Sequence, residues 1–123
     1  ALFSVAPLTE CARNVIQGCC PIKILESMAA GTPVIASNLL VVRELMSDGV
    51  QGMLVRPERP EALARAIRVV LEYPSLLVEM RSRCRDHIRE NFTWEHSVSK
   101  LRAAYARLHP FAVSANWQEK ERQ

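Results

Sequence analysis

Two thiols, an ammonium group and a carboxylate lie close together in one short stretch of the chain. Cys19 and Cys20 come directly before Pro21, and Lys23 and Glu26 follow within the next turn. Pro21 suits the first turn of a helix, where its missing N–H is not needed. The unpaired N–H groups and the positive dipole end of such a helix favour an anion. The stretch therefore predicts a phosphate or another anion at the helix start, with Lys23 as a candidate cation and Glu26 within reach of the ligand.

Each of these residues also has a plainer interpretation. Glu26 alone would be a solvated helix residue, and only the surrounding loop, helix stop and strand favour a ligand contact. Lys23 fits a solvated side chain as well as a phosphate contact. Cys19 and Cys20 are interpreted as small residues lining a pocket, because no histidine lies near them in sequence to activate a thiol.

The elements around this stretch alternate between strands and helices. In order, we expect a buried strand at 2–6, a loop at 8–20, a helix at 21–30, a buried strand at 33–37, a short helix at 41–47, a turn at 48–52 and a strand at 53–55. This β-α-β-α-β order with short connections indicates a parallel sheet with right-handed crossovers. Ligands of such sheets gather at the carboxyl ends of the strands, where the loop at 8–20 would lie.

Local signals support these boundaries. Gly31 occupies the position where a helix ends in a left-handed residue. Val34, Ile35 and Ala36 form a short apolar run that is typical of a strand buried on both faces. The glycines of the 48–52 turn are expected at positive φ. The apolar face of the first helix is expected at helical spacing, with Ile22, Leu25, Met28 and Ala29.

The pattern of the second half of the chain predicts three helices. Apolar residues recur at helical steps in 59–72 (Leu63, Ile67, Val70, Leu71), in 75–91 (Leu77, Met80, Cys84, Ile88) and after the N-cap candidate Thr93 (Trp94, Val98, Leu101, Tyr105, Leu108). We interpret Trp94 and Tyr105 as core or docking residues. The histidines His87, His96 and His109 are expected to be structural or solvated. Residues 109–123 are expected to form a polar tail.

Composition excludes several classes of protein. The 123 residues carry a net charge of +3. The basic residues gather at 81–89 and 100–107, on predicted helices that also carry Glu and Asp, which favours a solvated helix face over a nucleic-acid site. The four cysteines include no CxxC pair, so we expect free thiols in a reducing, cytoplasmic setting and no metal site. No apolar run reaches the roughly 18 residues that a membrane span needs. The apolar start without Met leads us to expect a piece of a longer protein.

The ordered set of motifs resembles the family 4-like, group 1 glycosyltransferases of GT-B fold. The resemblance is carried by Ala6-Pro7-Leu8, Gly18 to Ser37, Arg43-Glu44-Leu45, Asp48-Gly49, Gly52 to Val55 and Phe92-Thr93-Trp94-Glu95. It implies that residues 1–108 are an incomplete, C-terminal Rossmann-like domain that binds a nucleotide sugar. The fold class is thus α/β, with a partial parallel sheet of about three strands followed by helices.

The resemblance also implies roles for individual residues. The family signature contains two glutamates separated by seven residues, and Glu26 matches the second, which binds the ribose hydroxyls of the nucleotide. Gly18 stands at the position of the first glutamate, so this chain departs from the pattern there. Glu10 is another carboxylate of the same loop, and its spacing assigns it no role. The implied donor-binding residues are Gly18, Cys19, Cys20, Ile22, Lys23 and Glu26, with backbone N–H groups of the loop facing the sugar or diphosphate.

Two functions follow from these features. The first is a glycosyltransferase, retaining in the implied mechanism, that uses a UDP-, GDP- or ADP-sugar without cofactor or metal; the isolated chain would be inactive. Its partners would be the donor and an N-terminal domain of the same protein, with a peripheral membrane contact left open. The alternative is a non-catalytic α/β interaction module, suggested by Gly18. We further expect the isolated chain to self-associate through the 2–6 strand or the 93–108 helix.

Overall fold

The computed structural model describes residues 1–108, in which a three-stranded parallel sheet is followed by long helices. In chain order the elements are β1 (Ser4–Ala6), the π-helix η1 (Arg13–Gln17), α1 (Ile22–Ala29), β2 (Val34–Ser37), α2 (Leu40–Arg43), β3 (Gly52–Val55), α3 (Pro60–Glu72), α4 (Pro74–Asn91) and α5 (Trp94–Leu108). The chain divides into two compact units, Ala1–Glu90 and Asn91–Gln123. The expected polar tail at 109–123 lies outside the described residues.

The sheet has the order β1-β2-β3, and both pairings are parallel. This confirms the predicted α/β fold class with three strands. All four residues of β2 are buried, as expected for the central strand. The expectation of a buried strand at 2–6 was wrong in part: β1 starts only at Ser4, and Val5 is 41% exposed. The reason is that β1 pairs with a neighbour on one side alone.

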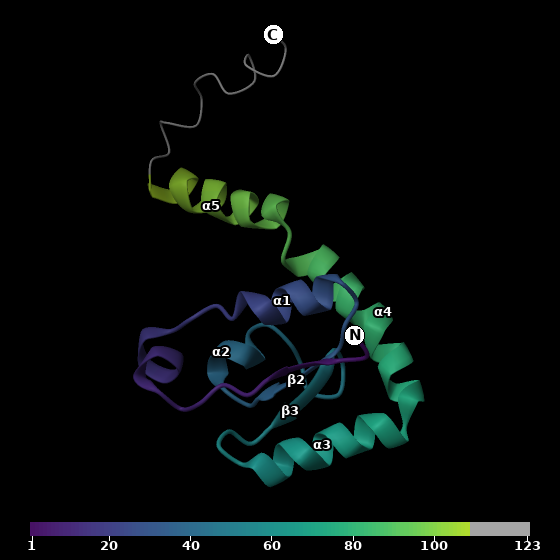
Figure 1. Ribbon diagram of the computed structural model, residues 1–123. Helices are drawn as coiled ribbons and strands as arrows, with labels where there is room; N and C mark the ends of the chain where they lie inside the picture. The colour runs from purple at the N-terminus through teal and green to yellow at the C-terminus, as the bar shows by residue number, and fades with distance from the viewer. Residues whose placement is uncertain (109–123) are drawn as a thin grey trace. The chain divides into compact units, whose positions relative to one another are not determined.

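Helices cover both faces of the sheet (Figure 1). On one face, Ile35 of β2 packs in a cluster with Ala66 and Val70 of α3 and Leu77 of α4. On the other face, the Ser4 hydroxyl donates to the Ser27 hydroxyl of α1 at 2.9 Å. Since strand residues alternate between faces, α1 and α3 lie on opposite sides of β2.

The buried side of α1 differs from the expected one. Ile24 and Met28 are 1% and 0% exposed, whereas Ile22 is 59% exposed. The sequence pattern misplaced this face because nearly every position of α1 is apolar or small, so spacing alone does not select one stripe. The predicted helix stop is confirmed, since Gly31 adopts φ 71° and its N–H donates to the Met28 carbonyl at 2.8 Å.

The two glycines of the turn before β3 have different roles. Gly49 has φ 72°, as predicted, but Gly52 does not have positive φ. Instead, a Cβ at position 52 would lie 1.9 Å from the Val34 carbonyl oxygen. Gly52 is therefore required by the close approach of β3 to the start of β2, which is a property of strand register.

Helix α4 runs past the amino ends of the strands (Figure 1) and buries Leu77, Met80 and Cys84. The Cys84 thiol donates to the Gln51 carbonyl oxygen at 3.1 Å. His87 Nε2 lies 2.8 Å from the Leu45 carbonyl oxygen, so this nitrogen carries the proton and His87 has the structural role predicted for it. On α3, Leu71 was expected in the core but is 54% exposed, and Ala66 is buried in the face instead.

Helix α5 belongs to the second unit. The predicted N-cap is confirmed, because the Thr93 hydroxyl accepts a hydrogen bond from the His96 N–H at 3.3 Å. Hydrogen bonds from the Glu95 backbone N–H and from Thr93 lower the pKa of the Glu95 carboxyl. Trp94 and Tyr105 are 84% and 59% exposed, α5 buries none of its residues, and their assignment as core or docking residues stays a prediction.

Within the described residues, every helix is too short or too polar to cross a lipid bilayer.

Candidate functional site

The loop between β1 and α1 is held in place by a buried asparagine. Asn14 is 8% exposed, and its Nδ2 donates to the Thr9 carbonyl oxygen at 2.8 Å. Its Oδ1 accepts a hydrogen bond from the Cys19 thiol at 3.3 Å. A buried side-chain amide that is bonded at both ends fixes the two halves of the loop relative to each other. Sequence reasoning missed this residue, because nothing in the pattern distinguishes Asn14 from its polar neighbours Arg13 and Gln17.

The loop is more ordered than the sequence suggested. Residues 8–20 were expected to be irregular, but Arg13–Gln17 form one turn of π-helix. Gly18 ends this turn with φ 76° and ψ 145°, a conformation that is accessible almost only to glycine. The residue at the position of the family's first glutamate therefore shapes the backbone here, and it brings no carboxylate.

The start of α1 lies at the carboxyl end of the sheet, because the loop with η1 leads from the end of β1 to α1, which runs back along the sheet (Figure 1). Pro21 is the N-cap and no side chain caps the helix. The N–H groups of Ile22 and Ile24 donate to the carbonyl oxygens of Cys20 and Pro21 at 2.8 and 2.9 Å. The Ile22 N–H is therefore engaged in a backbone turn before the helix, and the expectation that N–H groups of this stretch face the donor stays a prediction.

The predicted cation and carboxylate of α1 contact each other. Lys23 Nζ lies 3.0 Å from Glu26 Oε2, and the two side chains are 90% and 58% exposed. An ion pair this exposed contributes about 0–1 kcal/mol, so a ligand can separate it at little cost. The sequence named both residues but did not predict that each is the other's partner.

The six predicted site residues thus share one place in the fold. Ile22, Lys23 and Glu26 lie on the first turns of α1, Cys19 and Cys20 precede them, and Gly18 ends η1. Cys20 is exposed and Cys19 half-buried, and Glu10 is exposed in the same loop. The arrangement presents an ammonium group and a carboxylate beside an uncapped helix start. Together with the parallel sheet, it defines an α/β domain of the Rossmann-like class.

Comparison with known proteins identifies the family. A model of the family described as glycosyl transferases group 1 matches residues 16–91. The D-inositol 3-phosphate glycosyltransferase of Geodermatophilus obscurus is 42% identical over 81 residues, which are 66% of this chain and 17% of that protein. A lipopolysaccharide core biosynthesis mannosyltransferase of Rhizobium leguminosarum is 37% identical over 84 residues, 68% of this chain and 24% of the relative. The chain belongs to the group 1 glycosyltransferase family and spans about a fifth of the length of these relatives.

Solved structures agree on the fold. Sucrose-phosphate synthase from Thermosynechococcus elongatus superposes with a TM-score of 0.67 at 30% identity, over 72% of this chain and 22% of that one. Anabaena HepE, solved in complex with UDP and glucose, superposes with a TM-score of 0.67 at 23% identity, over 71% of this chain and 24% of that one. The architecture is that of the GT-B glycosyltransferases, as the sequence predicted.

Proposed function

We propose that this chain is the donor-binding part of a glycosyltransferase that moves a sugar from a nucleotide-diphospho-sugar to an acceptor, with retention of configuration. The observation that carries the proposal is the exposed Lys23–Glu26 pair at the uncapped start of α1, at the carboxyl end of a parallel sheet. Relatives named as glycosyltransferases, and a fold neighbour whose title names UDP and glucose, support it. The donor would be a UDP-, GDP- or ADP-sugar, with no resident cofactor.

The chemistry needs positive charge near the leaving group. Sugar transfer passes through an oxocarbenium-like centre while negative charge develops on the departing nucleoside diphosphate. Fixed dipoles and cations aimed at that charge lower the barrier, by about 3–4 kcal/mol for one well-placed donor. The start of α1 supplies the dipole, and Lys23 supplies a cation on a side chain that is free to turn toward phosphate.

Glu26 has a different role in this proposal. Its carboxylate accepts hydrogen bonds from the ribose hydroxyls of the donor, which orients the nucleotide without touching the bond that breaks. When the nucleotide binds, Glu26 exchanges its contact with Lys23 for these hydroxyls, and Lys23 moves to the diphosphate. One exposed ion pair is thereby replaced by two contacts to the same ligand.

Calorimetric titration of the full-length protein with UDP, GDP and ADP tests the proposal. Glu26→Ala is expected to weaken the nucleotide that binds by about 10–100-fold, the range for losing hydrogen bonds to a charged group. Glu79→Ala is the matched control, because Glu79 also forms an exposed ion pair on a helix, with Arg83 at 3.4 Å. Equal affinity of the Glu26→Ala and Glu79→Ala proteins would remove Glu26 from the site. If the full-length protein bound none of the three nucleotides, donor binding itself would be contradicted.

The interaction-module alternative rested on Gly18 at the position of an acidic residue. Gly18 has a structural reason to be glycine, since it ends η1 in a conformation other residues avoid. The relatives quoted above are named as transferases, which favours the enzyme.

A further inference from the structure

A hollow lies at the carboxyl end of the sheet, on the face covered by α3. Its volume is about 150 Å³, and its lining includes none of the six residues assigned to the donor. The walls come from the segment after β1, the last residues of β2 and β3, and the start of α3. The apolar part of the lining is made by Pro7, Leu8, Val55, Pro60 and Leu63.

A nearly buried serine lines this hollow, and its hydroxyl is not among the fully buried, unpaired polar atoms of residues 1–108. Ser37 is the last residue of β2 and is 3% exposed. It pairs in register with Val55 and lies on the same face as Ile35, which packs against α3. Among the hydrogen bonds of residues 1–108, none involves the Ser37 hydroxyl. Because Ser37 lines the hollow and its hydroxyl has no partner within the described part of the protein, the hydroxyl is available to a bound molecule.

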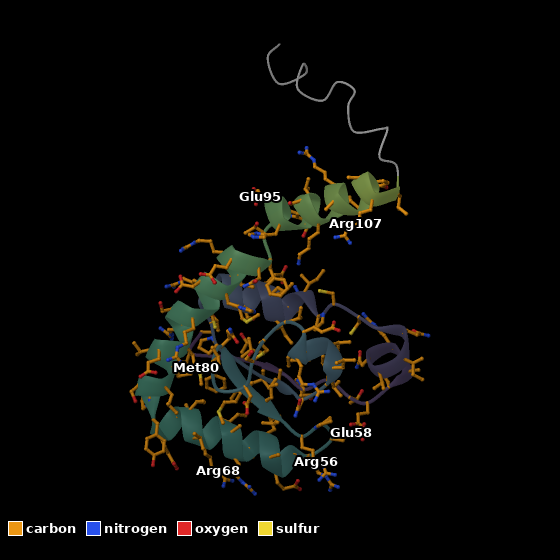
Figure 2. All side chains as sticks on the ribbon, turned by 180° about the vertical axis from the view of Figure 1, so that it is seen from behind. Arg56, Glu58, Arg68, Met80, Glu95 and Arg107 are labelled. Carbon is orange, nitrogen blue, oxygen red and sulfur yellow. The ribbon has the colours of Figure 1, made fainter. Side chains whose placement is uncertain are left out.

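Two guanidinium groups line the same hollow. Arg56 follows β3 and Arg59 is the N-cap of α3, and neither forms an ion pair within the part of the chain that the structure describes. Glu58 between them adds one opposing charge, which leaves an excess of one positive charge in the lining. Figure 2 shows Arg56 and Glu58 near the start of α3, with Arg68 further along the helix.

From these groups we infer a second ligand site, which takes a small organic anion: a body of a few carbons that carries one carboxylate or phosphate group. Guanidinium groups bind both kinds of anion in a bidentate manner. The Ser37 hydroxyl and the Thr9 hydroxyl provide further polar contacts, and the apolar wall contacts the carbon body. The site lies across the sheet from α1, so it is separate from the donor contacts, and it does not rest on the proposed function.

Three matched probes test the site in the full-length protein by calorimetry at low ionic strength. Glycerol 3-phosphate carries the phosphate, glycerate carries the carboxylate, and glycerol carries neither. Binding of either anion with no binding of glycerol supports the site, and the tighter of the two identifies the anionic group. Binding of neither anion, or equal binding of glycerol, would overturn it.

Substitutions then locate the binding. Arg56→Gln and Arg59→Gln are each expected to weaken the bound anion about tenfold or more, as for other charge-assisted hydrogen bonds. Ser37→Ala is expected to weaken it by a smaller factor. Arg68→Gln is the control, because Arg68 lies on α3 outside this hollow. An Arg68→Gln effect as large as that of Arg59→Gln would contradict the site.

A final titration tests whether the anion site is independent of the proposed donor site. The same anion is titrated into protein saturated with the nucleotide that binds best, and into the Glu26→Ala protein. The affinity for the anion is expected to stay within about twofold in both cases, because the contacts do not overlap. Displacement of the anion by nucleotide would show that the two ligands share one site and would overturn the inference, while leaving the donor proposal intact.

Discussion

The two ends of the sheet are built in opposite ways. At the amino end, Gly52 touches the backbone of β2, Cys84 is fully buried against Gln51, and both lie within packed surroundings. At the carboxyl end, the α1 start presents Lys23 and Glu26 at 90% and 58% exposure. The difference teaches that packed backbone and exposed charged side chains are separated along the strand direction, and that the exposed groups lie at the end where open α/β sheets bind ligands.

The largest expected effect is at the amino end. Gly52→Ala places a Cβ 1.9 Å from the Val34 carbonyl oxygen, against backbone that cannot move without breaking the β2–β3 pairing. We expect a loss of about 3 kcal/mol or more in the free energy of unfolding, or no soluble protein. Denaturant unfolding measures it.

Gly49→Ala is the control for that substitution. Gly49 also has a special conformation, with φ 72°, but open space surrounds the position of its missing Cβ. Gly49→Ala should then lower the free energy of unfolding by about 1 kcal/mol, because only the left-handed backbone conformation is unfavourable for alanine. Equal losses for the two variants would show that contact with β2 is not what requires Gly52.

The reactivity of the thiols should also differ between the two ends of the sheet. Burial raises the pKa of the Cys84 thiol to about 11, although the Arg85 charge opposes the shift. Cys11 and Cys20 are exposed. At pH 8 a thiol with a pKa near 11 is ionised roughly 100-fold less than an ordinary one, and only the thiolate reacts. Maleimide labelling followed by peptide mass spectrometry should therefore modify buried Cys84 much more slowly than exposed Cys20. Equal rates would show that the amino end opens readily.

The same shift predicts an alkaline limit to stability. The folded state holds Cys84 neutral to a higher pH than the unfolded chain, whose thiol ionises near 9. The stability that depends on this group is therefore complete below pH 9 and is lost as pH rises toward about 11. Denaturation midpoints measured across that range should fall, and Cys84→Ala should remove this part of the slope.

The smallest effect on folding is expected at Lys23. Lys23→Ala removes an exposed ion pair and should change the free energy of unfolding by less than about 0.5 kcal/mol. The same variant should weaken UDP more than UMP, because the second phosphate is the group that Lys23 is proposed to contact. Calorimetry with the nucleotide pair measures this difference, and Arg83→Ala on α4 serves as the control. Equal losses for UMP and UDP would place Lys23 away from the diphosphate.

The sequence predicted what local chemistry determines. The run at 33–37 became β2 at Val34–Ser37, Gly31 ended α1, and Thr93 capped α5. The sequence did not predict features that depend on contacts between segments far apart in the chain. The contact that requires Gly52 and the bonds of Asn14 depend on register and loop packing, which no local pattern contains.

For the candidate site, too, the sequence predicted the local stretch but not the contacts made within it. The sequence located the stretch around Lys23 and Glu26, but not their pairing or the engaged Ile22 N–H. The sequence did not predict the hollow on the α3 face, because no local pattern links Ser37 with Arg56 and Arg59. Only the alignment of β2 with β3 brings them together.

Hydrogen exchange with mass spectrometry tests the division between the two ends most directly. The full-length protein is compared with and without a saturating concentration of the nucleotide that binds best. We predict that amides in residues 18–26 gain protection, while those of 49–54 and 80–86 keep the protection they already have. Protection gained at the amino end, with none in 18–26, would contradict the assignment of the donor to the start of α1.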